Sequence, residues 1–145
     1  MIYADTSALV KRYLDEPFST DFDALLERST MAISRLTIVE MRCALSRRRR
    51  NREIDALRES RVNAELATDI QAGALWVSNI DDAQFTAAYN LIGRLAHIPL
   101  RTLDALHLAV AEQVSATAFA TADKTQADAA EALGFTVHRF FLSPS

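Results

Sequence analysis

The sequence predicts an α/β fold, in which a central parallel sheet of about five strands lies between two layers of helices. Short apolar runs of β type alternate along the chain with segments whose apolar residues recur every three or four positions. Strands that alternate with helices form parallel sheets that are covered on both faces. The 145 residues, half of them hydrophobic, suffice for one substantial core. We therefore expect a single domain over residues 1–145.

Five apolar runs are predicted strands, and only three glycines and three prolines interrupt the chain. The strands are predicted over residues 2–4, 31–34, 74–80, 118–122 and 136–141. Helical periodicity begins at Ala8 and recurs over residues 22–29, 37–50, 85–96 and 103–114. The chain shows no linker, repeat or low-complexity segment that would mark a domain boundary.

Acidic residues follow the predicted strands. Asp5 follows the first strand and Asp123 follows the fourth. Glu40 lies about one turn into the helix after the second strand, and Asp104 lies in the first turn of the helix that opens at Leu103. In parallel sheets, sites form beyond the carboxyl ends of the strands, near a topological switch point. Four carboxylates could therefore share one pocket.

Each acid also has a purely structural explanation. Thr37 and Glu40 have the spacing of a capping box. Asp123 and Gln126 have the same spacing, and an acid in a first turn, such as Asp104, is favoured by the helix dipole. Caps explain why acids occur at helix starts, but they do not explain why so many should converge on one edge of the sheet.

Convergence of carboxylates has an electrostatic cost. Two of them ~4 Å apart repel by about 1 kcal/mol in water and by about 4 kcal/mol at an effective dielectric constant of 20, so a cluster must take up protons or bind cations. Oxygen ligands without His or Cys favour Mg²⁺ or Mn²⁺. Such ions can activate a water for attack on a phosphodiester. The predicted reaction is metal-dependent phosphodiester hydrolysis.

Charge is distributed unevenly along the chain. The whole chain carries −3, yet residues 42–61 contain eight arginines against three acidic residues. A basic segment of this kind can attract a polyanion, and arginine binds the phosphates of a nucleic acid without recognising its base sequence. A solvated helix face, or a contact with a protein partner, is the alternative. The candidate phosphate-binding residues are Arg42, Arg47, Arg48, Arg49, Arg50 and Arg52.

Other features indicate the compartment and exclude some classes of site. No signal peptide or membrane span is predicted, and the lone Cys43, among apolar neighbours, is expected to be a buried thiol in a reducing cytoplasm. His107, on an apolar helix face, is expected to be a hydrogen-bonded core residue. The chain has no GxSxG elbow, no P-loop and no glycine-rich dinucleotide turn.

Four segments together resemble the PIN-domain family, and in this compact form its VapC-type toxins. They are MIYADTSALVKRYLDEP, TIVEMRCAL, RTLDALHLAVA and FATADKTQADAAEALGF, which occur in the family's order over nearly the whole chain. The resemblance implies a PIN-like α/β/α fold. It also implies a cytoplasmic ribonuclease that forms homodimers and is inhibited by a VapB-type antitoxin.

Site residues follow from the same resemblance. The family's metal-binding acids fall on Asp5, Glu40, Asp104 and Asp123, which are the predicted catalytic residues with Mg²⁺ or Mn²⁺ as cofactor. Its hydroxyl groups fall on Ser7 or Thr6 and on Thr121, where they would orient an acid or a water. Cys43 is a departure, because relatives often have a polar residue there.

Two alternatives to a nuclease remain. A receiver-like signalling domain also binds Mg²⁺ with aspartates, but its phosphate acceptor would have to be Asp81 or Asp82 after the third strand. With Gln84 ahead of a helix, these two residues are more typical of an N-cap and first turn. A catalytically silent PIN-type module that only binds a partner is the second alternative, and metal-dependent cleavage would exclude it.

Overall fold

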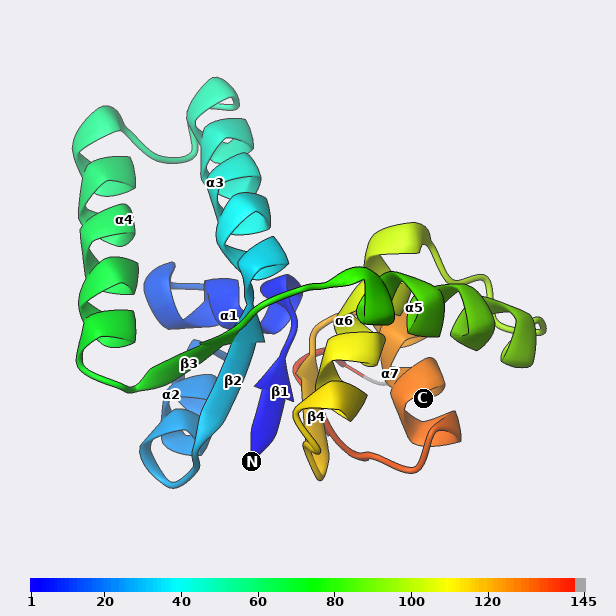
Figure 1. Cartoon of the computed structure of the whole chain (residues 1–145). Coiled ribbons are helices and arrows are strands. Elements are labelled where there is room, and N and C mark those ends of the chain that lie inside the picture. Colours follow the sequence, from blue (N-terminus) through cyan, green and yellow to red (C-terminus); the bar gives the residue numbers. More distant parts are fainter. Residues whose placement is uncertain (143–145) are drawn as a thin grey trace.

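Five parallel strands form the central sheet of the computed structural model, which describes residues 1–142 (Figure 1). The order across the sheet is β3-β2-β1-β4-β5, and every neighbouring pair is parallel. The predicted sheet is thereby confirmed, although the third and fifth strands end two residues earlier than predicted. The strands are β1 (Ile2–Ala4), β2 (Met31–Ser34), β3 (Leu75–Ser78), β4 (Ala118–Thr121) and β5 (Thr136–Arg139).

Helices cover both faces of this sheet, as predicted (Figure 1). One face packs against α1, α2, α3 and α4, and the other packs against α5, α6 and α7. None of the helices within residues 1–142 is long and apolar enough to cross a membrane. The helices are α1 (Thr6–Tyr13), α2 (Ser19–Glu27), α3 (Arg35–Arg50), α4 (Ala56–Gln71), α5 (Asp82–Arg94), α6 (Thr102–Gln113) and α7 (Lys124–Ala132).

The central strand β1 shows how three residues serve both layers. Successive side chains of a strand point to opposite faces. Ile2 and Ala4 accordingly belong to the core beneath α1 and α2, whereas Tyr3 belongs to the core beneath α5 to α7. All three are buried, and Tyr3 packs on Phe119 of β4 with ring centroids 5.5 Å apart. Burial on both faces explains why β1 is a continuous apolar run.

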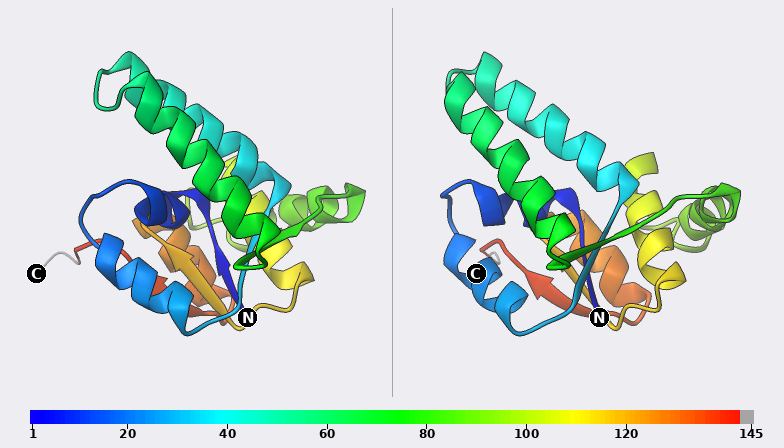
Figure 2. Two further views of the ribbon diagram at one scale, coloured as in Figure 1. Left: turned by 90° about the vertical axis from the view of Figure 1, so that its left-hand side faces the viewer. Right: turned by 60° about the vertical axis from the view of Figure 1, so that its left-hand side comes forward.

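Helices α3 and α4 form a hairpin that projects beyond the sheet (Figure 2). Helix α4 is not among the helical patterns predicted from the sequence. Only Val62 and Leu66 within it are buried, so its apolar periodicity is weak, and most of its surface faces solvent. Asp55 caps it by accepting from the Arg58 amide. The hairpin carries the arginine-rich segment away from the sheet.

Two glycines make opposite demands on the backbone and give a test of this fold. Gly134 ends α7 with φ +94°, a conformation that costs a residue with a Cβ about 1 kcal/mol, whereas Gly93 lies within α5. A Cβ at either position meets nothing within 4 Å. Gly134→Ala should therefore lower the free energy of unfolding by about 1 kcal/mol, and Gly93→Ala should raise it by about 0.5 kcal/mol. Chemical denaturation measures both, and shifts of the same sign would contradict the described end of α7.

Candidate active site

The strand order places a switch point between β1 and β4. After β1 the chain builds one half of the sheet through β2 and β3, and then crosses to build the other half with β4 and β5. Crevices at such points form beyond the carboxyl ends of the strands. A cavity of about 430 Å³ lies here, and all four predicted acids line it. The fold thus brings together Asp5, Glu40, Asp104 and Asp123.

Asp5 lies at the end of β1 and caps α1. Its Oδ1 accepts from the Ala8 amide at 3.1 Å and from the Ser7 hydroxyl at 2.6 Å. Its Oδ2 accepts from Thr121 at 2.6 Å. Burial raises the pKa of Asp5 above its usual value, although the nearby His107 and the two hydroxyl donors oppose this shift. A buried carboxylate of this kind is destabilised when it is ionised and no cation is close.

Hydroxyl groups join the ends of β1 and β4. Ser7 Oγ accepts from the Ala122 amide at 2.8 Å, and Thr121 Oγ1 accepts from the Asp123 amide at 3.0 Å. The two hydroxyl oxygens are 3.3 Å apart. Both hydroxyls therefore have backbone donors that fix their positions, and each can direct its own proton to Asp5. The hydroxyl of Thr6, the other candidate, donates instead to Glu40 Oε1 at 2.7 Å.

Glu40 faces the cavity from α3 and plays no part in capping that helix. The alternative explanation of Glu40 by a Thr37–Glu40 capping box does not hold, because the helix begins earlier and Ser34 forms the box with Thr37. Glu40 Oε1 instead accepts from Thr6 and lies 2.5 Å from His107 Nε2. Burial raises the pKa of Glu40, but the hydrogen bonds and the charge of His107 outweigh burial and hold this pKa below its usual value.

Asp104 and Asp123 approach the cavity from the starts of α6 and α7. Asp104 Oδ2 accepts from the Arg101 amide at 3.3 Å. Asp123 caps α7 by accepting from the Gln126 amide at 3.2 Å. The Gln126 side chain does not complete a capping box with Asp123 but donates to the Asp104 carbonyl at 2.9 Å. Gln126 thus fixes the two acid-bearing helix starts relative to each other.

The donor set suits a hard cation that keeps part of its water shell. Within residues 1–142, no three His, Cys, Asp or Glu side chains are arranged to hold one ion among themselves. The cavity nevertheless presents carboxylate and hydroxyl oxygens from four separate elements. Mg²⁺ is commonly bound by one or two carboxylates together with several waters, so a closed protein cage is not required. The residues therefore fit Mg²⁺ or Mn²⁺.

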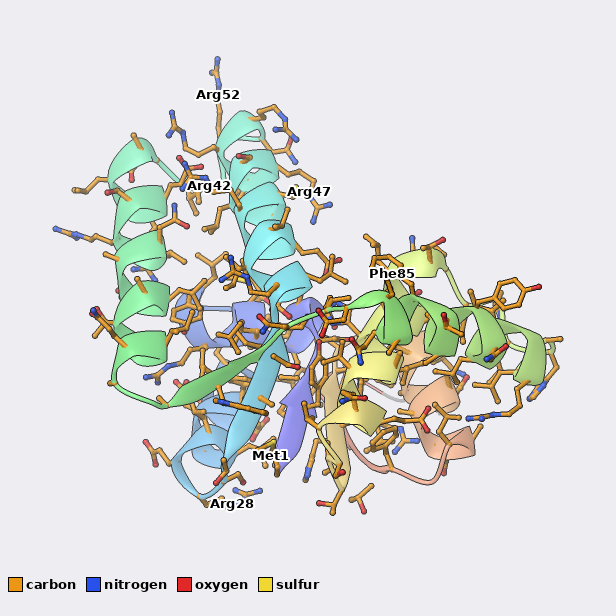
Figure 3. All side chains as sticks on the ribbon, viewed as in Figure 1. Met1, Arg28, Arg42, Arg47, Arg52 and Phe85 are labelled. Carbon is orange, nitrogen blue, oxygen red and sulfur yellow. The ribbon has the colours of Figure 1, made fainter. Side chains whose placement is uncertain are left out.

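Only part of the arginine-rich segment reaches this cavity. Arg47 and Arg48 line it, but Arg48 also pairs with Glu16 at 2.9 Å. Arg49 pairs with Glu59 at 3.1 Å. Figure 3 shows Arg47, Arg42 and Arg52 at different places around the α3–α4 hairpin. Arg42 lines a separate apolar groove between α3 and α4, Arg50 is exposed, and Arg52 lies in the turn between the two helices.

Arg101 was missed by the sequence reasoning. It lines the cavity directly before α6, and its Nε lies 3.5 Å from Asp104 Oδ2. Its side chain is 84% exposed, so it is free to move towards a bound anion. The only indication in the sequence was that Arg101 lies three residues before Asp104, a predicted site residue. An isolated arginine outside the basic segment forms no charge pattern that would mark it as a phosphate-binding residue.

Of three other expectations, one is wrong and two are confirmed. Cys43 was predicted to be buried, but it is exposed and lines the cavity. The buried face of α3 is formed by Met41 and Leu45 instead. His107 is a hydrogen-bonded core residue as predicted, being only 3% exposed. Asp81 caps α5 in a capping box with Gln84, which is the structural role expected for it.

Comparisons with known proteins agree with this architecture. A family model described as "PIN domain" matches residues 2–132, and no curated protein matches the sequence significantly. Mycobacterium tuberculosis VapC20, described as a sarcin-ricin loop cleaving toxin, superimposes with a TM-score of 0.70 at 16% identity, over 94% of this chain and 97% of that one.

Two structures of complexes are also similar. FitAcB from Neisseria gonorrhoeae gives a TM-score of 0.70 at 19% identity, over 94% of this chain and 96% of that one. VapBC2 from Rickettsia felis, bound to a DNA fragment from its promoter, gives a TM-score of 0.65 at 16% identity, over 97% of this chain and 99% of that one. At these identities the likeness concerns the fold.

Proposed function

The chain belongs to the PIN-domain family, and we propose that it is a single-domain, metal-dependent endoribonuclease that acts as the toxin of a toxin–antitoxin pair. The observation that carries this proposal is the cavity at the switch point, which four acids from separate elements line together. A structural role as helix caps does not require these acids to share one cavity. The VapC20 neighbour, described as a toxin that cleaves the sarcin-ricin loop, supports RNA as substrate.

The four acids would bind the metal in this proposal. Asp5, Glu40, Asp104 and Asp123 would hold one or two Mg²⁺ or Mn²⁺ ions. Such an ion, when bound, supplies a nucleophilic water at neutral pH and neutralises charge that develops on the phosphate.

The hydroxyl groups and arginines have supporting roles in this proposal. Ser7 and Thr121 would keep the Asp5 carboxylate in one orientation through their 2.6 Å hydrogen bonds. Thr6 would do the same for Glu40. Arg47 and Arg101 would bind substrate phosphates, because both line the cavity and arginine pairs well with phosphate oxygens.

Protein partners are part of the same proposal. The neighbours include the VapBC2 complex, which supports a VapB-type antitoxin as the inhibitor of this chain. The groove between α3 and α4, lined by Ile38, Val39 and Leu66 among others, offers such a partner an apolar surface. Phe85, labelled in Figure 3, and Tyr89 lie one turn apart on α5 and are both largely exposed, which supports a homodimer.

Cleavage by the purified chain tests the proposed function. The chain, freed of any antitoxin, is incubated with a mixed RNA pool and a matched DNA pool in Mg²⁺, in Mn²⁺ and in EDTA. We expect cutting of RNA that requires the metal. A folded chain that binds the metal but cuts no RNA would favour the silent binding module instead.

Arg47 gives a test of substrate binding that is separate from the chemistry. Arg47→Ala should weaken RNA binding about fivefold and lower the slope of log affinity against log salt by about 0.7, because one contact to a single-stranded phosphate is lost. The matched control is Arg42→Ala, on the same helix but outside the cavity. Fluorescence anisotropy over a series of salt concentrations measures both. Equal losses in the two variants would refute a specific role for Arg47.

A further inference from the structure

A chain of hydrogen bonds runs from the core of the sheet to the cavity through one histidine. Tyr3 of β1 and His107 of α6 are both buried, and the Tyr3 hydroxyl lies 2.7 Å from His107 Nδ1. His107 Nε2 lies 2.5 Å from Glu40 Oε1 on α3. Tyr3 is held in turn by Ser34, to which its hydroxyl donates at 3.0 Å. Three elements of the fold are thus joined behind the Glu40 carboxylate.

The surroundings of His107 make a purely packing role costly. Residues 105–111 of α6 are all buried, and His107 is the one polar side chain among them. A buried polar group destabilises the fold unless it is hydrogen-bonded, and an apolar residue would avoid this requirement altogether. The histidine meets the requirement by pairing both of its ring nitrogens, one with Tyr3 and the other with Glu40.

The hydrogen bond between His107 and Glu40 has a definite donor and acceptor. An ionised carboxylate only accepts hydrogen bonds, so His107 Nε2 is the donor in this pair. His107 and Thr6 both act on the same oxygen, Oε1, and neither of their bonds uses Oε2. Glu40 also lines the cavity, so the carboxylate is held by one oxygen while these two bonds leave its other oxygen free to bind a ligand there.

We propose that His107 is a positioning residue, which together with Tyr3 holds the Glu40 carboxylate so that its second oxygen can bind a divalent cation in the cavity. This inference rests on the proposed function, because it gives Glu40 a metal to bind. The partners behind metal ligands typically contribute about 10- to 100-fold to metal affinity. Both ring nitrogens of His107 are already paired with Tyr3 and Glu40, so in this role the histidine acts through Glu40 although it also lines the cavity.

Replacement of His107 by leucine and by glutamine separates positioning from packing. Leucine fills similar space without a donor, whereas glutamine carries its amide nitrogen the same number of bonds from Cβ as His Nε2 and can still donate to Glu40. The full chain, stripped with EDTA and dialysed, is titrated with Mn²⁺, and the free ion is followed by electron paramagnetic resonance. We expect His107→Leu to weaken Mn²⁺ binding about tenfold or more, and His107→Gln to restore most of the affinity.

Controls decide whether the effect passes through Glu40. His138→Leu removes a histidine from β5, outside the cavity, and should leave Mn²⁺ affinity unchanged. In a Glu40→Gln background, His107→Leu should change the affinity by less than about twofold, because the residue it acts through is already altered. Circular dichroism and thermal unfolding establish that each variant is folded.

The outcomes distinguish this inference from the proposed function. A folded His107→Leu protein that binds Mn²⁺ as tightly as the parent would overturn the inference and leave the metal site intact. If His107→Leu does not fold, Tyr3→Phe replaces it, and we expect a loss of a few-fold; parental affinity in Tyr3→Phe would then overturn the inference. A parent protein that binds no Mn²⁺, like its Asp5→Asn variant, would overturn the proposed function and the inference with it.

Discussion

Asp5→Asn should reduce RNA cleavage at least about a hundredfold while the fold persists. The loss of about 3 kcal/mol of charge stabilisation in the transition state corresponds to that factor in rate. The fold should persist because asparagine has nearly the same shape and its carbonyl oxygen can still cap α1. Ser7 can still donate to that carbonyl oxygen, and the Thr121 hydroxyl can rotate to accept from the new amide nitrogen, since a hydroxyl both donates and accepts.

Asp55→Asn is the matched control for this variant. Asp55 caps α4 as Asp5 caps α1, by accepting from the amide three residues later, but it lies outside the cavity. Initial rates of cleavage at saturating Mg²⁺ measure both proteins. Parental activity in Asp5→Asn would remove Asp5 from the proposed site, and equal losses in both variants would point to capping as the cause.

Without metal, the stability of Asp5→Asn should depend on pH differently from that of the parent. Because burial raises the pKa of Asp5 in the folded chain, the folded state binds this proton more tightly than the unfolded state does. The contribution of Asp5 to stability is therefore present below the unfolded pKa and is lost as pH rises through the higher folded pKa. Asp5→Asn should be more stable than the parent at neutral pH, and this advantage should shrink on acidification. Denaturation at a series of pH values measures the difference.

The sequence allowed the main architecture to be predicted because its signals are strong. The central strands are short apolar runs buried on both faces, and the helices between them have clear apolar periodicity. Parallel topology then placed Asp5 and Asp123 at one edge without any knowledge of contacts. The convergence of Glu40 and Asp104 on the same cavity required the helices α3 and α6 to begin at that edge, which they do.

The features that were missed depend on tertiary contacts. Helix α4 buries only two residues, so its sequence lacks a strong apolar stripe. Cys43 has apolar neighbours in sequence but lies on the cavity side of α3. Apolar neighbours along the chain do not indicate which side of the helix a residue occupies. His107 was expected to be a core histidine, yet its pairing with Glu40, 67 residues away in sequence, has no local signal.

Addition of Mn²⁺ or Mg²⁺ to the metal-free protein should stabilise the fold. A ligand that binds only the folded state at 100 times its dissociation constant raises the free energy of unfolding by about 2.7 kcal/mol. The gain has a local cause, since a cation relieves the cost of ionised Asp5 in its buried place and lowers the repulsion among the cavity acids. Asp5→Asn should gain much less, because the buried charge that the cation offsets is absent.

Thermal and chemical unfolding with and without the metal measure this stabilisation, at neutral pH and again near pH 5. At the lower pH the gain should be smaller, because the raised pKa of Asp5 makes protons compete with the cation for its carboxylate. Asp55→Asn should keep the full parental gain. An equal gain in the parent and in Asp5→Asn would place the cation elsewhere on the chain, and Asp5 and Asp123 would then be explained by their roles as helix caps.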